Sequence, residues 1–173
     1  MKYREILILV FLFLPIFLSS VYAQPQMGKK APGFTTSTLD GERIALKDYW
    51  KKQGGKVIVL SFFATWCQPC RGDIQYLQKV QDQHRNRGLE VFFVLTRDSA
   101  KMEAVENFMQ ELEVELPVLL DENGIIAKRY RVTGLPRNFL IDRKGILKGR
   151  YLGYSGNVKL NFEGLLKGLL TIP

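Results

Sequence analysis

The hydrophobic positions of the chain alternate between short continuous runs and stripes with helical spacing. Three of the runs have the length of a strand and are apolar at nearly every position, as in strands buried on both faces of a sheet. They cover residues 57–63, 89–95 and 116–120. Two further strands, 137–141 and 146–152, are joined by the turn Asp142-Arg143-Lys144-Gly145 and are predicted to form a hairpin.

The segments between these strands have helical periodicity. Residues 68–87 carry one apolar stripe and end at Gly88, a residue type that commonly terminates helices. Residues 100–112 are expected to form a helix that begins after a capping Asp98 or Ser99. The buried side of that helix is expected to hold Met102, Val105, Phe108, Met109 and Leu112. Further helices are expected at 46–50, 125–130 and 157–170.

A small hairpin precedes the first buried strand. Residues 34–38 and 43–46 flank Leu39-Asp40-Gly41-Glu42, which carries the Asp-Gly signal of a tight turn. Strands that alternate with helices pair in parallel through right-handed crossovers, and the C-terminal hairpin adds antiparallel strands. The order predicts an α/β fold, a three-layer α/β/α domain with a mixed central sheet and an added N-terminal β-hairpin. The domain would span residues 34–173 behind a loose polar leader at 24–33.

The first 23 residues have the pattern of an export signal. Lys2 and Arg4 precede an unbroken apolar run over residues 6–18, and a small-residue end follows at Val21-Tyr22-Ala23. This order is typical of a secretory signal peptide that is cleaved after Ala23, and an uncleaved membrane anchor is the alternative. In both cases the chain is predicted to be exported, to the periplasm or the outer face of the cytoplasmic membrane, where thiols meet oxidising conditions.

The charge is basic but scattered. The full sequence has 25 Lys and Arg against 17 Asp and Glu, a formal net charge of +8. The basic residues lie mostly at expected turns and helix ends, and no basic helix interleaved with aromatic residues occurs. Nucleic-acid binding is therefore not expected. Attraction to an acidic partner or to anionic headgroups remains open.

The two cysteines, Cys67 and Cys70, stand where a buried strand passes into a helix. Free backbone N–H groups and the positive end of the helix dipole stabilise a thiolate at the first position. The second cysteine lies one turn further on, shielded and within reach of the first. Pro69 suits the first turn because its missing N–H would have no partner there. This spacing favours a redox-active pair that needs no bound cofactor.

Three other roles for the pair are weaker. A structural crosslink around four residues stabilises a fold by about 2 kcal/mol or less. A zinc site needs four ligands, and the sequence has no second cysteine pair. Copper delivery by the two thiolates with His84, the only histidine, is a further alternative, as is a client-binding module with an incidental cysteine pair.

Two segments resemble the signatures of thioredoxin-like proteins. The first is Phe62-Phe63-Ala64-Thr65-Trp66-Cys67-Gln68-Pro69-Cys70-Arg71, and the second is Gly134-Leu135-Pro136-Arg137-Asn138-Phe139-Leu140-Ile141-Asp142. With the N-terminal hairpin, the chain resembles exported redoxins of the TlpA/ResA type over residues 29–173. The resemblance implies that Pro136 is cis and faces the cysteine pair. It also implies that Leu135 offers an exposed edge for pairing, and that Trp66, Gln68 and Pro69 shape the site.

The sequence departs from the family pattern at several positions. Ser61 stands where thioredoxin has a buried aspartate, and Arg137 follows the proline where the family commonly has threonine. A cation near the thiols would favour the thiolate and raise the reduction potential, whereas one pointing to solvent would not. Leu60 and Ala64 occupy the positions at which peroxiredoxins carry proline and a hydroxyl residue, so peroxide reduction is disfavoured.

The expected function is therefore thiol-disulfide exchange with exported proteins, most simply as a reductant. Cys67 would attack the client disulfide, and Cys70 would then release the reduced client. The resemblance implies apocytochrome c or other exported proteins as clients, and a membrane thiol-transfer protein as electron donor. A monomer is expected. A thiol oxidant or isomerase of the same fold is the alternative within this class.

Overall fold

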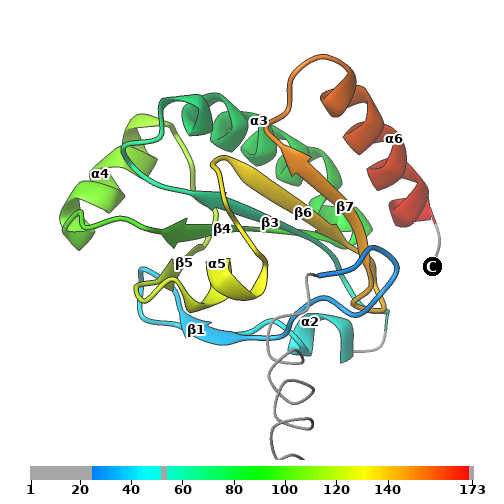
Figure 1. The fold of residues 1–173 in the computed structure, drawn as a ribbon. Coiled ribbons are helices and arrows are strands. Elements are labelled where there is room, and N and C mark those ends of the chain that lie inside the picture. The colour runs from blue at the N-terminus through cyan, green and yellow to red at the C-terminus, as the bar shows by residue number, and fades with distance from the viewer. Residues whose placement is uncertain (1–24, 52–53, 172–173) are drawn as a thin grey trace, which may run out of the picture.

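A five-stranded mixed sheet forms the centre of the computed structural model, which describes residues 25–51 and 54–171 (Figure 1). Its strand order is β5-β4-β3-β6-β7. The strands are β3 (Val57–Phe63), β4 (Leu89–Thr96), β5 (Val118–Asp121), β6 (Arg137–Ile141) and β7 (Leu147–Leu152). A separate two-stranded hairpin joins β1 (Thr35–Ser37) to β2 (Arg43–Ala45).

The direction of pairing follows the order of the elements. β3 pairs in parallel with β4, and β4 with β5, across connections that contain helices. β6 runs antiparallel to β3, and β7 antiparallel to β6 across the short turn at 142–146. Every residue of β3 is buried, which explains its continuous apolar run, because strands covered on both faces have no solvent side.

Helices and the small hairpin cover the two faces of the sheet. The helices are α2 (Asp48–Lys51), α3 (Gln68–His84), α4 (Met102–Glu111), α5 (Ile125–Arg129) and α6 (Asn157–Thr171), with a 3-10 turn, η1, at Arg85–Arg87. α3, α4 and α6 lie on one face of the sheet, and α5 and the hairpin lie on the other (Figure 1). The apolar side chains of these two groups form two separate core clusters. The predicted three-layer architecture with a mixed sheet is confirmed.

Only part of the N-terminal region for which the sequence makes predictions lies within the described residues. Residues 1–24, which include the predicted signal peptide or anchor, lie outside them. In the segment predicted as a loose leader, Gly28 N–H donates to the Leu147 carbonyl and Ala31 N–H to the Gly145 carbonyl, both at 2.9 Å. No helix within residues 25–51 or 54–171 has the length and apolar character needed to cross a membrane.

Two expectations for the helix after β4 are wrong. The residue that caps α4 is Lys101, not Asp98 or Ser99, and no side chain caps the helix. The Asp98 carboxylate lies three residues before Lys101, and it accepts hydrogen bonds from Thr65 and from the Ala100 backbone N–H rather than from the first turn of α4. Met102 is 41% exposed rather than buried, because α4 begins at this residue and turns its first position outward.

Candidate active site

Cys67 and Cys70 form a disulfide at the start of α3, with their α carbons 5.4 Å apart. Cys67 is the N-cap residue, in extended conformation, and Pro69 lies in the first turn. No side chain caps this helix end, and the Cys70 N–H donates to the Cys67 carbonyl at 3.0 Å. Once the disulfide is reduced, the positive end of the helix and the Gln68 N–H favour a negative charge on the Cys67 sulfur. Cys70 is fully buried, whereas Gln68 and Pro69 are exposed at the rim.

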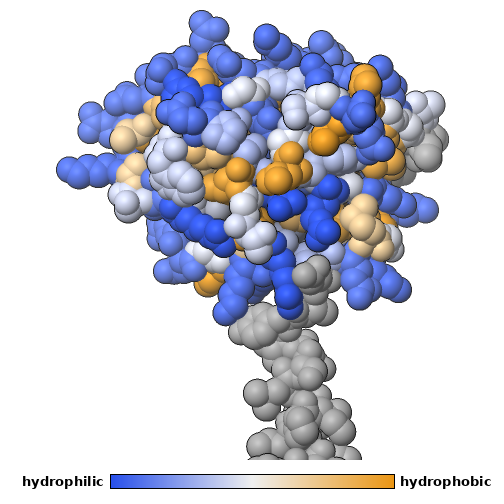
Figure 2. Space-filling view, turned by 45° about the horizontal axis from the view of Figure 1, so that its top comes forward, coloured by the Kyte–Doolittle hydropathy of each residue, from blue (hydrophilic) through white to orange (hydrophobic). Residues whose placement is uncertain are grey.

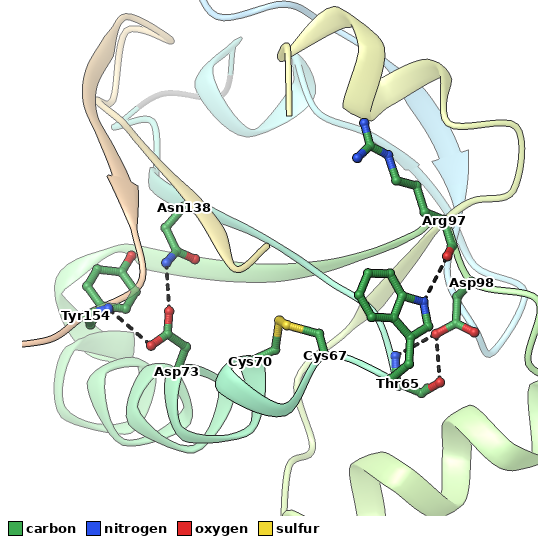
Figure 3. The surroundings of a disulfide bond; sticks show 9 residues. Thr65, Cys67, Cys70, Asp73, Arg97, Asp98, Asn138 and Tyr154 are labelled. Atoms are coloured by element: carbon green, nitrogen blue, oxygen red, sulfur yellow. Dashed lines mark hydrogen bonds between the residues drawn. A yellow bond between two sulfur atoms is a disulfide. The ribbon is translucent and has the colours of Figure 1, made fainter. Parts of the chain in front are cut away.

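The residues before the disulfide are fixed to the loop that follows β4 (Figure 3). The Asp98 carboxylate accepts hydrogen bonds from the backbone N–H of Thr65 at 2.6 Å and from its hydroxyl at 2.8 Å. The indole N–H of Trp66 donates to the Arg97 carbonyl at 3.1 Å. These bonds hold the turn that presents Cys67, and they leave the Trp66 side chain 61% exposed beside it.

Asp73 lies on the buried side of α3, three residues after Cys70 and thus one helical turn away. Its side chain accepts a hydrogen bond from the Asn138 amide and another from the Tyr154 backbone N–H, both at 3.1 Å (Figure 3). Burial raises the pKa of the Asp73 carboxyl above its ordinary value, and the two hydrogen bonds only partly oppose that shift. A carboxyl group with a raised pKa therefore lies one helical turn from Cys70.

The second predicted signature leads into β6, the strand that pairs with β3. The Leu135–Pro136 peptide bond is cis, as the resemblance implied. Pro136 is buried and Leu135 is half-buried, packed against both core clusters. A Cβ at Gly153 would lie 3.9 Å from Pro136 and 3.8 Å from an Asp73 oxygen, so the proline loop and the carboxylate both lie beside Gly153.

Arg137 leaves the sheet on the face opposite α3. Asn138, the next residue, faces Asp73 of α3, and successive strand residues alternate between faces. The guanidinium is half-buried, and burial together with the charge of Arg150 lowers the pKa of Arg137. The Arg137 side chain is therefore not inserted between α3 and the sheet, and it is not fully exposed to solvent either.

Several buried polar atoms in this part of the structure have no hydrogen-bond partner. They include the Asn138 amide oxygen, the Tyr154 hydroxyl oxygen and the Ser61 hydroxyl oxygen. Ser61 and Asn138 are paired residues of β3 and β6, so both stand on the α3 side of the sheet. Ser61, which stands at the position of thioredoxin's buried aspartate, therefore lies in the same polar group as Asp73.

Two of these residues, Asp73 and Asp98, are not among the site residues that the sequence predicted. A signal for Asp73 is present, because it occupies the buried stripe of the helix with Cys70, Ile74 and Leu77. A charge on an apolar stripe is unusual and indicates a special role. Asp98 has no such signal, since its partner Thr65 is 33 residues away in the sequence.

The histidine of the copper hypothesis is remote from the disulfide. His84 ends α3, and Cys67 precedes its first residue, so about 24 Å of helix separates them. Among the described residues, no group of three or more His, Cys, Asp or Glu side chains is placed to hold a metal ion.

Comparison with known proteins agrees with this geometry. The AhpC/TSA family model matches residues 27–150. The thiol-disulfide oxidoreductase ResA of Bacillus thuringiensis is 37% identical over 120 residues, which are 69% of this chain and 66% of that protein. The ResA of a Bacillus cereus strain is 34% identical over 142 residues, covering 82% and 78% of the two chains.

Comparison of the fold with solved structures gives relatives of the same class of protein. A solved structure of a candidate thiol:disulfide interchange protein DsbE from Chlorobium tepidum matches with a TM-score of 0.73 and 29% identity. The match covers 84% of this chain and 98% of that one. The chain therefore belongs to the AhpC/TSA family, among the thioredoxin-like thiol-disulfide oxidoreductases of the ResA type.

Proposed function

We propose that this protein is exported and reduces disulfide bonds in other exported proteins. The observation that carries the proposal is a cysteine pair at an uncapped helix N-terminus with a buried carboxyl one turn further on. The names of the ResA relatives support the reaction class. The basic, apolar N-terminal pattern of residues 1–23 supports export.

The reaction proceeds by two exchanges. The reduced protein's Cys67 thiolate attacks one sulfur of the client disulfide, and the other client sulfur leaves as a thiolate that takes a proton. The Cys70 thiolate then attacks the Cys67 sulfur, which breaks the mixed disulfide and releases the second client thiol. The client gains two electrons and two protons, and Cys67 and Cys70 return to the disulfide.

Asp73 serves the second exchange. Cys70 is fully buried, so water has little access to remove its proton. The Asp73 carboxylate is one helical turn from Cys70, and its raised pKa makes it a better proton acceptor than an ordinary aspartate. Pro136 and Leu135 hold the client backbone opposite Cys67, and Trp66 and Pro69 border the exposed rim.

The electron donor and the clients follow from the compartment. A reductant in an oxidising environment must be recharged, and a membrane thiol-transfer protein is the proposed donor. Exported thiol proteins, apocytochrome c among them, are the proposed clients. No cofactor beyond the Cys67–Cys70 pair is required, because the electrons are carried by the two thiols.

The reduction potential tests the direction of this reaction. The protein would be equilibrated with glutathione mixtures and the fraction of the Cys67–Cys70 disulfide measured, with Cys67→Ser/Cys70→Ser as the control that lacks the couple. A value near that of thioredoxin, about −270 mV, is expected for a reductant. A value near about −120 mV would instead identify an oxidant. Equal client turnover by the double variant would show that the cysteines are incidental.

A further inference from the structure

Two arginines lie side by side on the face of the sheet opposite α3, at its exposed β7 edge and next to the proline loop. In the β6–β7 register, Arg137 pairs with Leu152 and Phe139 pairs with Arg150. Arg137 and Arg150 are therefore diagonal neighbours on one face, within reach of a common ligand. β7 is an edge strand, and Arg150 and Leu152 are exposed on it.

Neither guanidinium has an acidic partner. Among residues 25–51 and 54–171, no Asp or Glu oxygen forms a salt bridge with Arg137 or Arg150. The Arg137 Nε atom is buried and makes no hydrogen bond. A buried, charged donor without an acceptor is costly, and two neighbouring cations repel each other. A carboxylate bound between them would relieve both costs, because guanidinium groups bind carboxylates in a planar fork.

The arginine pair adjoins the surface that meets a client. Arg137 directly follows Pro136, and Gly153, whose Cβ position lies 3.9 Å from that proline, directly follows Leu152. Leu152 is 58% exposed, and Trp66 is exposed next to Cys67. On the face shown in Figure 2, apolar side chains gather in small groups among hydrophilic ones. Charge rather than a broad apolar patch therefore offers the means of selecting a partner.

We propose that Arg137 and Arg150 bind an Asp or Glu side chain that flanks the reactive cysteine of the client protein. The proposal rests on the proposed function, because it assigns the client of the same disulfide. The acidic side chain would approach along the exposed face of β7, while the client cysteine meets Cys67. The arginines are specificity residues, and the exchange itself stays with the two cysteines.

The test compares two disulfide-linked peptides that differ only in charge. In one peptide, glutamate stands within two residues on each side of the cysteine; in the other, glutamine replaces it. The reduced protein is mixed with each, and the second-order rate of disulfide loss is measured at low and at high salt. The variants are Arg150→Gln, Arg137→Gln and Lys47→Gln. Lys47 is an exposed cation beside α2, at the end of β3 that is remote from the disulfide.

The expected result is a preference for the glutamate peptide of roughly three- to tenfold at low salt. The preference should shrink at about 1 M salt, where the screening length is only about 3 Å. Each arginine variant should lower the ratio of the two rates toward one, whereas Lys47→Gln should keep the wild-type ratio. Arg150 is exposed and forms no hydrogen bond or salt bridge with the other described residues, so Arg150→Gln should fold and tests the inference even if Arg137→Gln fails to fold.

Equal rates for the two peptides would overturn the inference and leave the proposed function standing. A preference that persists in Arg150→Gln and at high salt would also overturn it. If the wild-type protein reduced neither peptide, the proposed function would fail, and this inference with it.

Discussion

Asp73 and Asp121 are both buried aspartates beside the central sheet, 8% and 4% exposed, yet their surroundings differ. Asp121 ends β5 and accepts three hydrogen bonds, from the Thr96 hydroxyl and from two backbone N–H groups of α5. Asp73 accepts two, and next to it the Asn138 amide oxygen and the Ser61 hydroxyl have no partners.

The comparison distinguishes a carboxylate that stabilises the fold from one that is positioned to take part in the reaction. Asp121 supplies acceptors to the first turn of α5, which has no other side-chain cap. Asp73 has fewer donors, lies one turn from Cys70, and has a raised pKa because burial outweighs its two hydrogen bonds. Two carboxylates with similar burial therefore differ in role, according to which donors surround each of them and what stands beside it.

Removing the Asp121 carboxylate should have the largest effect on stability. Asp121→Ala leaves three buried donors unpaired, which should lower the free energy of unfolding by about 2 to 4 kcal/mol. Urea denaturation measures this loss, with the exposed Asp82→Ala as control. Client reduction per folded molecule should stay within about twofold of wild type. A much slower exchange in a folded Asp121→Ala protein would contradict the comparison.

Asp73→Asn should affect the rate instead. Without a proton acceptor near Cys70, release of the client from the mixed disulfide should slow by on the order of a hundredfold, while its formation by Cys67 is little changed. Quenched-flow trapping of the mixed disulfide separates the two steps. The variant should fold, because its side-chain N–H groups can pair with the free Asn138 oxygen. Unchanged release would remove Asp73 from the mechanism.

The pH dependence of stability is the smallest effect. Burial raises the Asp73 pKa, so between the unfolded value of about 3.9 and the folded value the native protein holds a proton that the unfolded chain releases. The stability that Asp73 contributes is thus full below the unfolded pKa and is lost as pH rises through the folded pKa. The Asp73→Asn variant has no carboxyl group at this position, so its stability does not fall in this way as pH rises.

The measurement is urea unfolding of the oxidised proteins from about pH 4 to neutrality. Cysteines in a disulfide do not titrate, so they add nothing to the slope. The free energy of unfolding of Asp73→Asn should rise relative to wild type as pH increases. A difference that stays constant over this range would show that the Asp73 pKa is not raised on folding.

The sequence predicted the architecture well because the signals involved are local. The apolar run of β3 and the periodicity of α3 arise from residues that are neighbours in sequence. The Cys67–Cys70 pair is equally local, since its spacing and its place at a helix start belong to one short segment. Asp98 was misassigned as a helix cap because α4 begins only after Lys101, and the hydrogen bonds from Thr65 to Asp98 join segments that are 33 residues apart in the sequence.

By itself the sequence determined the order of elements, the mixed sheet and the disulfide at the N-terminus of α3, because periodicity and helix-end chemistry depend on residues close in the chain. The tertiary structure alone decided which distant groups surround that disulfide. It placed Asn138 and Tyr154 on Asp73, and it set Arg137 beside Arg150. Such contacts depend on strand register and on how a helix lies across the sheet, and these are fixed only when the whole core packs.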